Sequence, residues 1–111
     1  MFGLFGRRNV KDLTAAEVAD GVAAGTFVVV DVREPHETAV ERFPGAVLMP
    51  LSRFDPDELP VADGRALVFA CASGMRSIKA SETAQAAGLK SDAHLAGGLK
   101  AWKAAGYPTE R

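Results

Sequence analysis

The stretch Phe69-Ala70-Cys71-Ala72-Ser73-Gly74-Met75-Arg76-Ser77 contains the single cysteine of the chain and is the best guide to its fold. Before the cysteine, residues 65–70 form a short apolar run with the length of a buried strand. After it, residues 77–87 are rich in alanine and carry apolar positions at helical spacing. Cys71 is therefore expected at the carboxyl end of a strand, in a loop that opens a helix.

Such a loop favours a reactive cysteine. Its backbone N–H groups can converge on one point, the helix N-terminus adds about half a positive charge there, and Arg76 adds a fixed cation. These effects favour the thiolate, which is the nucleophilic form of cysteine. The alternative is a buried cysteine that only fills space, but the flanking Ser73, Gly74, Arg76 and Ser77 favour a nucleophile. We predict that Cys71 is partly solvent-accessible and has a lowered pKa.

Length and composition indicate one soluble domain. The chain has 111 residues, 48% hydrophobic and 24% charged, with a net charge of -1 that does not favour nucleic-acid binding. One cysteine excludes an internal disulfide framework and fits a reducing compartment, so we expect a cytoplasmic protein. No apolar run approaches the roughly 18 residues of a membrane span. Residues 1–9 are expected to form an N-terminal extension that docks loosely, with weak membrane-surface contact as the alternative.

Hydrophobic patterns predict alternating strands and helices. Thr14 and Glu17 form a capping box that predicts a helix over residues 15–24, and the β-branched run at 27–32 predicts a buried strand. Further strands are expected at 46–49, 67–70 and 91–95, and helices beginning at 34, at 77 and at 99, with a brief helix or turn at 55–59. This alternation is typical of an α/β fold with a mainly parallel sheet, helices on both faces, and a ligand site at the carboxyl ends of the strands.

Four motifs in this order and spacing resemble a single-domain rhodanese. They are residues 31–37 (Asp-Val-Arg-Glu-Pro-His-Glu), 44–46 (Pro-Gly-Ala), the Cys71 loop, and 95–102 (Leu-Ala-Gly-Gly-Leu-Lys-Ala-Trp). The resemblance covers about residues 10–108 and implies a rhodanese-like domain with a five-stranded sheet. It also implies that Cys71 forms a persulfide, that Arg76 helps to hold an anionic sulfur donor, and that the loop binds the outer sulfur. The expected loop residues are Ala72, Ser73, Gly74, Met75 and Ser77.

The implied activity is a sulfurtransferase of the thiosulfate:cyanide type that needs no cofactor or metal. Its partners would be a small sulfur donor and a cyanide, glutathione or protein-thiol acceptor. One alternative is a carrier module that receives its sulfur from another protein. A phosphatase or arsenate reductase is disfavoured, because four residues separate Cys71 from Arg76 and the related dual-specificity phosphatases carry one more.

Two departures from the family pattern bear on these expectations. Ala72 stands where some thiosulfate-specialised members carry a basic residue, which weakens the case for thiosulfate in particular. Glu41-Arg42-Phe43 stands where the family usually has Gly-His-Ile, and there we expect altered surface contacts with unchanged chemistry.

Five further side chains have both structural and functional interpretations. Asp31 and Arg33 are expected at the rim of the pocket, paired with backbone or opposite charge rather than with substrate. Ser77 either caps the helix or donates a hydrogen bond to a persulfide. His36 and His94 are too isolated in the sequence to be metal ligands, and no catalytic histidine is expected, because the loop and Arg76 suffice to activate the cysteine.

Overall fold

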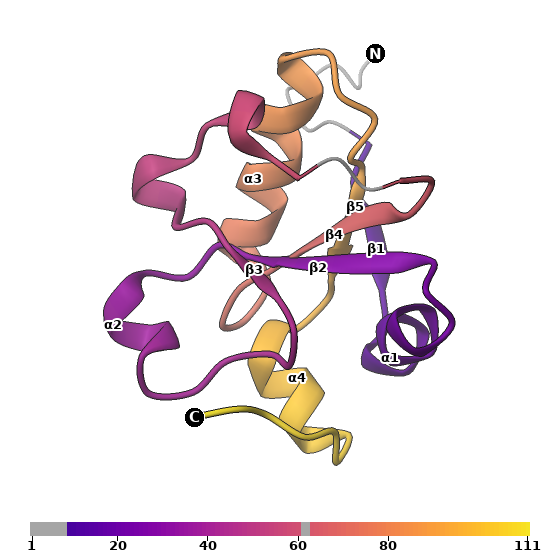
Figure 1. Cartoon of the computed structure of the whole chain (residues 1–111), viewed down its shortest axis with the longest axis vertical. Helices are drawn as coiled ribbons and strands as arrows, with labels where there is room; N and C mark the ends of the chain where they lie inside the picture. Colours follow the sequence, from indigo (N-terminus) through magenta and orange to yellow (C-terminus); the bar gives the residue numbers. More distant parts are fainter. Residues whose placement is uncertain (1–8, 61–62) are drawn as a thin grey trace.

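The computed structural model describes residues 9–60 and 63–111, so the predicted extension at residues 1–9 lies outside the described residues except for Asn9. In this part of the chain, strands and helices alternate from end to end (Figure 1). The strands are β1 (Lys11–Leu13), β2 (Phe27–Asp31), β3 (Val47–Leu48), β4 (Ala66–Ala70) and β5 (Ala93–Leu95). The helices are α1 (Ala15–Ala23), α2 (Pro35–Thr38), α3 (Met75–Ala86) and α4 (Gly98–Ala104), with 3₁₀ turns η1 (Leu51–Arg53) and η2 (Pro56–Glu58).

The five strands form one sheet in the order β1-β5-β4-β2-β3, and every paired neighbour is parallel. The predicted α/β fold with a five-stranded, mainly parallel sheet is therefore confirmed. Strand β4 lies in the centre, between β2 and β5, so its carboxyl end is flanked by the ends of both neighbours. The loop that follows β4 consequently starts from the middle of the molecule.

Helices cover both faces of the sheet, as predicted. Helices α1 and α4 lie on one face, and α3 with the two 3₁₀ turns lies on the other (Figure 1). Successive residues of β2 serve the two cores alternately, because side chains of a strand point to opposite faces: Val29 packs with α1 and α4, and Val30 packs with α3. A strand buried on both faces explains the continuous β-branched run at this position.

The predicted elements are present with small shifts at their ends. The capping box forms: Glu17 N–H donates to Thr14 Oγ1 over 3.1 Å, and Thr14 N–H donates to Glu17 Oε1 over 2.9 Å. Helix α3 begins at Met75, two residues earlier than predicted, because Gly74 takes the N-cap position with a left-handed φ of 111°. Strand β1 was not located by pattern, since it is three residues long and two of them are charged; its pairing with β5 creates it.

Phe43, the last residue of the segment Glu41-Arg42-Phe43, packs into the core. The expectation that this segment makes surface contacts is therefore wrong for Phe43. Phe43 is 1% exposed and meets the ring of Trp102 edge-on, with 5.5 Å between the ring centroids. The guanidinium carbon of Arg33 lies over the Phe43 ring, 5.9 Å from the ring centroid. The aromatic residue therefore fills the space between α4 and the rim of the site.

Candidate functional site

The Cys71 loop lies where the sequence predicted it, between the carboxyl end of β4 and the first turn of α3. The left-handed conformation of Gly74 turns its own N–H back into the loop, where it donates to Cys71 Sγ over 3.1 Å. A residue with a Cβ would be strained at this φ. The loop thus directs a backbone amide and the positive end of a twelve-residue helix toward one sulfur atom.

Helix α4 holds the same loop from the other side. The N–H of Leu99 donates to the Cys71 carbonyl over 2.8 Å, and the N–H of Lys100 donates to the Ala72 carbonyl over 3.1 Å. Gly98 permits this approach, since any Cβ there would overlap the Cys71 and Ala72 carbonyls. The absence of a side chain at Gly98 therefore brings the amino end of α4 against the backbone of the loop.

The prediction that Cys71 is partly solvent-accessible is wrong, because its residue is 1% exposed. The sulfur packs with the core on the α3 face, together with Val32 and Phe69. Its pKa is nevertheless lowered, as predicted. Burial acts to raise the pKa of Cys71, but the Ser77 hydroxyl and the amides of Ser77, Gly74 and Ser73 outweigh it by stabilising the thiolate. The charge is thus supported by hydrogen bonds rather than by water.

Ser77 is a member of the site and does not cap the helix. Gly74 holds the N-cap position, so Ser77 lies inside the first turn of α3, fully buried. Its Oγ lies 3.6 Å from Cys71 Sγ, 3.1 Å from the Gly74 carbonyl and 2.8 Å from His94 Nδ1. His94 Nε2 in turn lies 2.6 Å from Asp12 Oδ1. Four side chains from four elements therefore form a continuous chain that ends at the cysteine.

His94 is the residue that sequence reasoning missed. It was set aside as isolated, and it lies 17 positions from Ser77 along the chain, but parallel pairing of β5 with β4 brings the two together. Alternation offered a signal, because Ala93 and Leu95 point to the α4 face and His94 must then point to the α3 face. A histidine inside a sheet that is covered on both faces needs polar partners.

The Arg76 side chain binds Glu37. Its Nη1 and Nη2 bind the two carboxylate oxygens of Glu37 over 2.6 and 2.9 Å, which joins α3 to α2. The Arg76 side chain hydrogen bonds hold the pKa of Glu37 at about 2, although partial burial acts to raise it. Glu37 in turn raises the pKa of Arg76, to which the charge of Cys71 also contributes. The fork that was expected to meet a substrate anion thus meets a carboxylate of the protein.

Asp31 and Arg33 pair with each other, as expected. Arg33 Nε and Nη2 donate to the two oxygens of Asp31 over 3.1 and 2.9 Å, and Nη2 also donates to the Glu41 carbonyl over 2.8 Å. Both side chains are buried. The pair closes the turn after β2 beside the site. The remaining predicted loop residue, Met75, opens α3 with its side chain 76% exposed.

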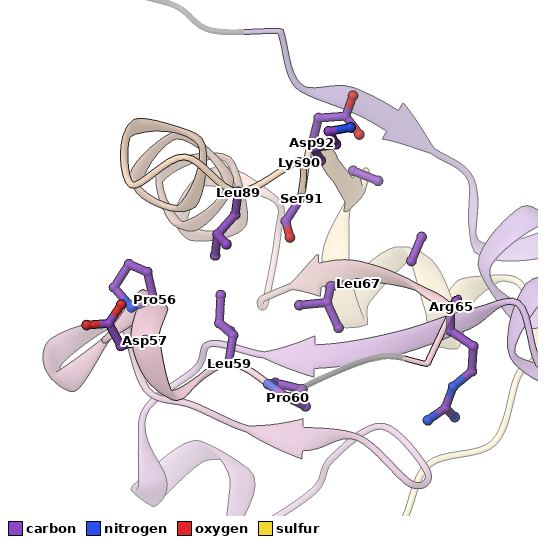
Figure 2. Close-up of a pocket in the computed structure, with 13 residues that line it drawn as sticks. Pro56, Asp57, Leu59, Pro60, Arg65, Leu67, Leu89, Lys90, Ser91 and Asp92 are labelled. Atoms are coloured by element: carbon purple, nitrogen blue, oxygen red, sulfur yellow. The ribbon is translucent and has the colours of Figure 1, made fainter.

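A cavity of about 640 Å³ is lined by residues at the start of β4 and just before β5 (Figure 2), whereas Cys71 follows the end of β4. Leu59 and Leu89 point toward each other across it, and Leu67 near the start of β4 lines its side. It is separated from Cys71 by the length of β4, roughly 15 Å at the usual rise per residue. We assign it no role in the chemistry of Cys71.

The described ranges 9–60 and 63–111 lack two features. No group of three or more histidine, cysteine, aspartate or glutamate side chains there is placed to hold a metal ion. No helix there is long and apolar enough to cross a membrane.

Comparisons with curated proteins give two named relatives. The chain is 46% identical over 82 residues to an uncharacterised protein of Synechocystis, a match that covers 74% of this chain and 46% of the relative. It is 32% identical over 93 residues to the probable adenylyltransferase/sulfurtransferase MoeZ of Mycobacterium tuberculosis, covering 81% of this chain and 24% of that protein. The chain therefore spans less than half the length of either relative.

Solved structures share the fold. A rhodanese-related protein of Thermoplasma volcanium superposes with a TM-score of 0.76 at 27% identity, covering 90% of this chain and 97% of that one. A protein of Rhodopseudomonas palustris described as a possible tyrosine phosphatase gives 0.78 at 34% identity, covering 91% and 85%. The model of the rhodanese-like domain matches residues 14–105, which include the whole Cys71 loop. This chain belongs to the rhodanese-like domain family.

Proposed function

We propose that this protein is a sulfurtransferase that carries sulfane sulfur on Cys71, from a donor such as thiosulfate to a thiophilic acceptor. The observation that carries the proposal is the contact between the Gly74 N–H and Cys71 Sγ, 3.1 Å long, in a loop whose other amides also stabilise the thiolate. Backbone donors fixed around a sulfur atom suit a bound anionic sulfur. The family membership supports the same chemistry.

The reaction divides into two displacements. The Cys71 thiolate attacks the outer sulfur of thiosulfate, the sulfur–sulfur bond of the donor breaks, and sulfite leaves with the bonding electron pair. The enzyme then carries a persulfide, whose terminal anion faces the amides of the loop. Cyanide attacks that terminal sulfur, the persulfide bond breaks, and thiocyanate leaves while the thiolate is restored. The sequence has no second cysteine, so no internal disulfide can discharge the persulfide.

Kinetics with thiosulfate and cyanide test this proposal. We expect thiocyanate to form by a ping-pong mechanism, and mass spectrometry of the donor-treated protein to show one added sulfur on Cys71. The Cys71→Ser variant should neither load nor turn over, because a hydroxyl cannot form the sulfur–sulfur bond. Hydrolysis of an aryl phosphate by the wild type, without thiocyanate from any donor, would instead assign the chain to the phosphatase class.

A second candidate is a carrier module that takes its sulfur from the persulfide of another protein. The observation that favours it is the contrast between the buried sulfur and Met75, whose apolar side chain stands 76% exposed in the same loop. A partner protein that docks on this loop to deliver its sulfur would cover the Met75 side chain. Loading of Cys71 by a protein persulfide, with no use of thiosulfate, would select the carrier.

A further inference from the structure

We propose that His94 is a positioning residue for Cys71. The imidazole of His94 takes the proton of the Cys71 thiol through the hydroxyl of Ser77, while Asp12 holds the imidazole in place. This inference rests on the proposed role of Cys71 as the nucleophile. It adds a histidine and an aspartate to a site that otherwise consists of one loop.

The geometry gives an unbroken path. Cys71 Sγ lies 3.6 Å from Ser77 Oγ, Ser77 Oγ lies 2.8 Å from His94 Nδ1, and His94 Nε2 lies 2.6 Å from Asp12 Oδ1. The first three side chains are buried, whereas the side chain of Asp12 is 64% exposed. The path therefore connects a sulfur atom that water does not reach with the surface beside β1.

The partners fix the direction of the hydrogen bonds. A carboxylate has no proton to donate, so His94 Nε2 carries the proton that Asp12 accepts. In the neutral ring, Nδ1 is then an acceptor. The Ser77 hydroxyl has one proton and two acceptors near it, the Gly74 carbonyl at 3.1 Å and His94 Nδ1 at 2.8 Å, and in the shorter contact it donates to Nδ1. This leaves a lone pair of Ser77 Oγ to accept the S–H of Cys71. All three hydrogen bonds then point from the thiol toward the aspartate, as a transfer of the thiol proton requires.

The transfer balances without any further reactant. The S–H bond of Cys71 breaks as a new O–H bond forms on Ser77, and the original O–H bond of Ser77 breaks as an N–H bond forms on His94 Nδ1. The products are a thiolate, an unchanged serine and an imidazolium beside the Asp12 carboxylate. Ser77 now donates to the sulfur, and the charge on His94 is opposed by the charge on Asp12.

The groups around His94 favour this assignment. The ionisable side chains that face it are Asp12, from β1, and Cys71, reached through Ser77 of α3. Its register partner on β4 is the uncharged Phe69. Lys11 of β1 and Asp92, the residue just before β5, form an ion pair with 3.9 Å between Nζ and Oδ2. The imidazole thus lies between one carboxylate and the serine that contacts the cysteine.

The pH dependence of Cys71 alkylation by iodoacetamide tests the proposal. In His94→Asn we expect the midpoint of the rate profile to rise by about one pH unit, a roughly tenfold fall in rate at neutral pH. His36→Asn is the matched control, because it removes the exposed histidine of the chain and should leave the profile unchanged. A folded His94→Asn protein with the wild-type midpoint overturns the proposal.

Asp12→Ala provides the second variant, because an exposed position on the edge strand tolerates truncation. We expect a fall of about threefold in the rate at neutral pH, smaller because solvent screens the exposed carboxylate. If His94→Asn does not fold, an unchanged Asp12→Ala profile overturns the proposal in its place. The assay contains neither donor nor acceptor, so a failure of sulfur transfer would leave its outcome unaffected.

Discussion

Two arginine–carboxylate pairs lie at the carboxyl end of the sheet, and they differ in how completely water is excluded. The Arg33–Asp31 pair is buried, with side chains 4% and 0% exposed, and joins residues two apart. The Arg76–Glu37 pair, with side chains 34% and 23% exposed, joins residues 39 positions apart on two different helices, α3 and α2. The first pair contributes to the stability of the fold, because removing either partner would leave a buried charge unpaired. The second retains contact with solvent, so its arginine remains within reach of a small anion.

The largest expected effect follows from breaking the buried pair. Arg33→Ala leaves the Asp31 carboxylate buried and unpaired, and should lower the free energy of unfolding by about 3–5 kcal/mol. Arg42→Ala removes an arginine whose side chain is 36% exposed and lies 3.8 Å from Glu110, and should cost less than about 1 kcal/mol. Chemical denaturation of both variants measures the difference. Equal losses would show that burial does not distinguish these arginines.

Arg76→Lys should affect the reaction more than the fold. An ammonium cannot reproduce the forked contact of a guanidinium, so use of a sulfur donor should fall roughly tenfold. The loss of stability should stay within about 1 kcal/mol, because the pair is partly solvated. Steady-state kinetics and thermal melting decide between the two effects. A large fall in melting temperature with unchanged turnover would make Arg76 purely structural.

Glu37→Gln should show a stability cost that depends on pH. The pKa of Glu37 is lowered from 4.5 to about 2 in the folded protein, so its contribution is complete above pH 4.5 and is lost as the pH falls toward 2. We expect a deficit of about 1 kcal/mol at neutral pH, discounted for solvent screening. Urea denaturation across this range measures it against the surface control Glu58→Gln. A deficit that persists at pH 2 would contradict the assignment.

The smallest effect on stability is expected for the contact between Ser52 and the Glu34 carboxylate at the surface. Ser52 donates to both carboxylate oxygens of Glu34 through its hydroxyl and its N–H, which lowers the pKa of that carboxyl. Ser52→Ala removes the hydroxyl donor, and the carboxyl pKa should rise toward its ordinary value with stability nearly unchanged. Carbon-detected NMR titration of Glu34 measures the shift. A marked loss of stability in Ser52→Ala would show that this surface contact also contributes to folding, against our expectation.

Local pattern was sufficient to predict most of the fold. The run at residues 27–32, the capping box and the alanine-rich stretch after Cys71 each determine their element through nearest neighbours in the sequence. Strand β1 has no such signal, since Lys11 and Asp12 are not strand formers and the segment is ordered by pairing with β5.

The site was predictable only in part, because some of its contacts join residues that lie far apart in the sequence. The position of Cys71 and the lowered pKa follow from one loop, but the partners of that loop come from elsewhere. Glu37 lies 39 residues before Arg76, and His94 lies 17 residues after Ser77. The burial of Cys71 depends on its packing with the core on the α3 face, whose members Val32 and Phe69 come from the turn after β2 and from β4, and no local pattern predicts this packing.

The contact that Gly98 permits between α4 and the loop has a consequence for the energetics of sulfur transfer. Because the Cys71 and Ala72 carbonyls accept hydrogen bonds from the Leu99 and Lys100 amides, their orientation is fixed before any substrate arrives. Dipoles fixed in advance need no reorientation when charge moves onto the sulfur, so the reorganisation energy of that step is small. A side chain at Gly98 would unfix those carbonyls, and a helix with no contact to the sulfur would thereby alter its reactivity.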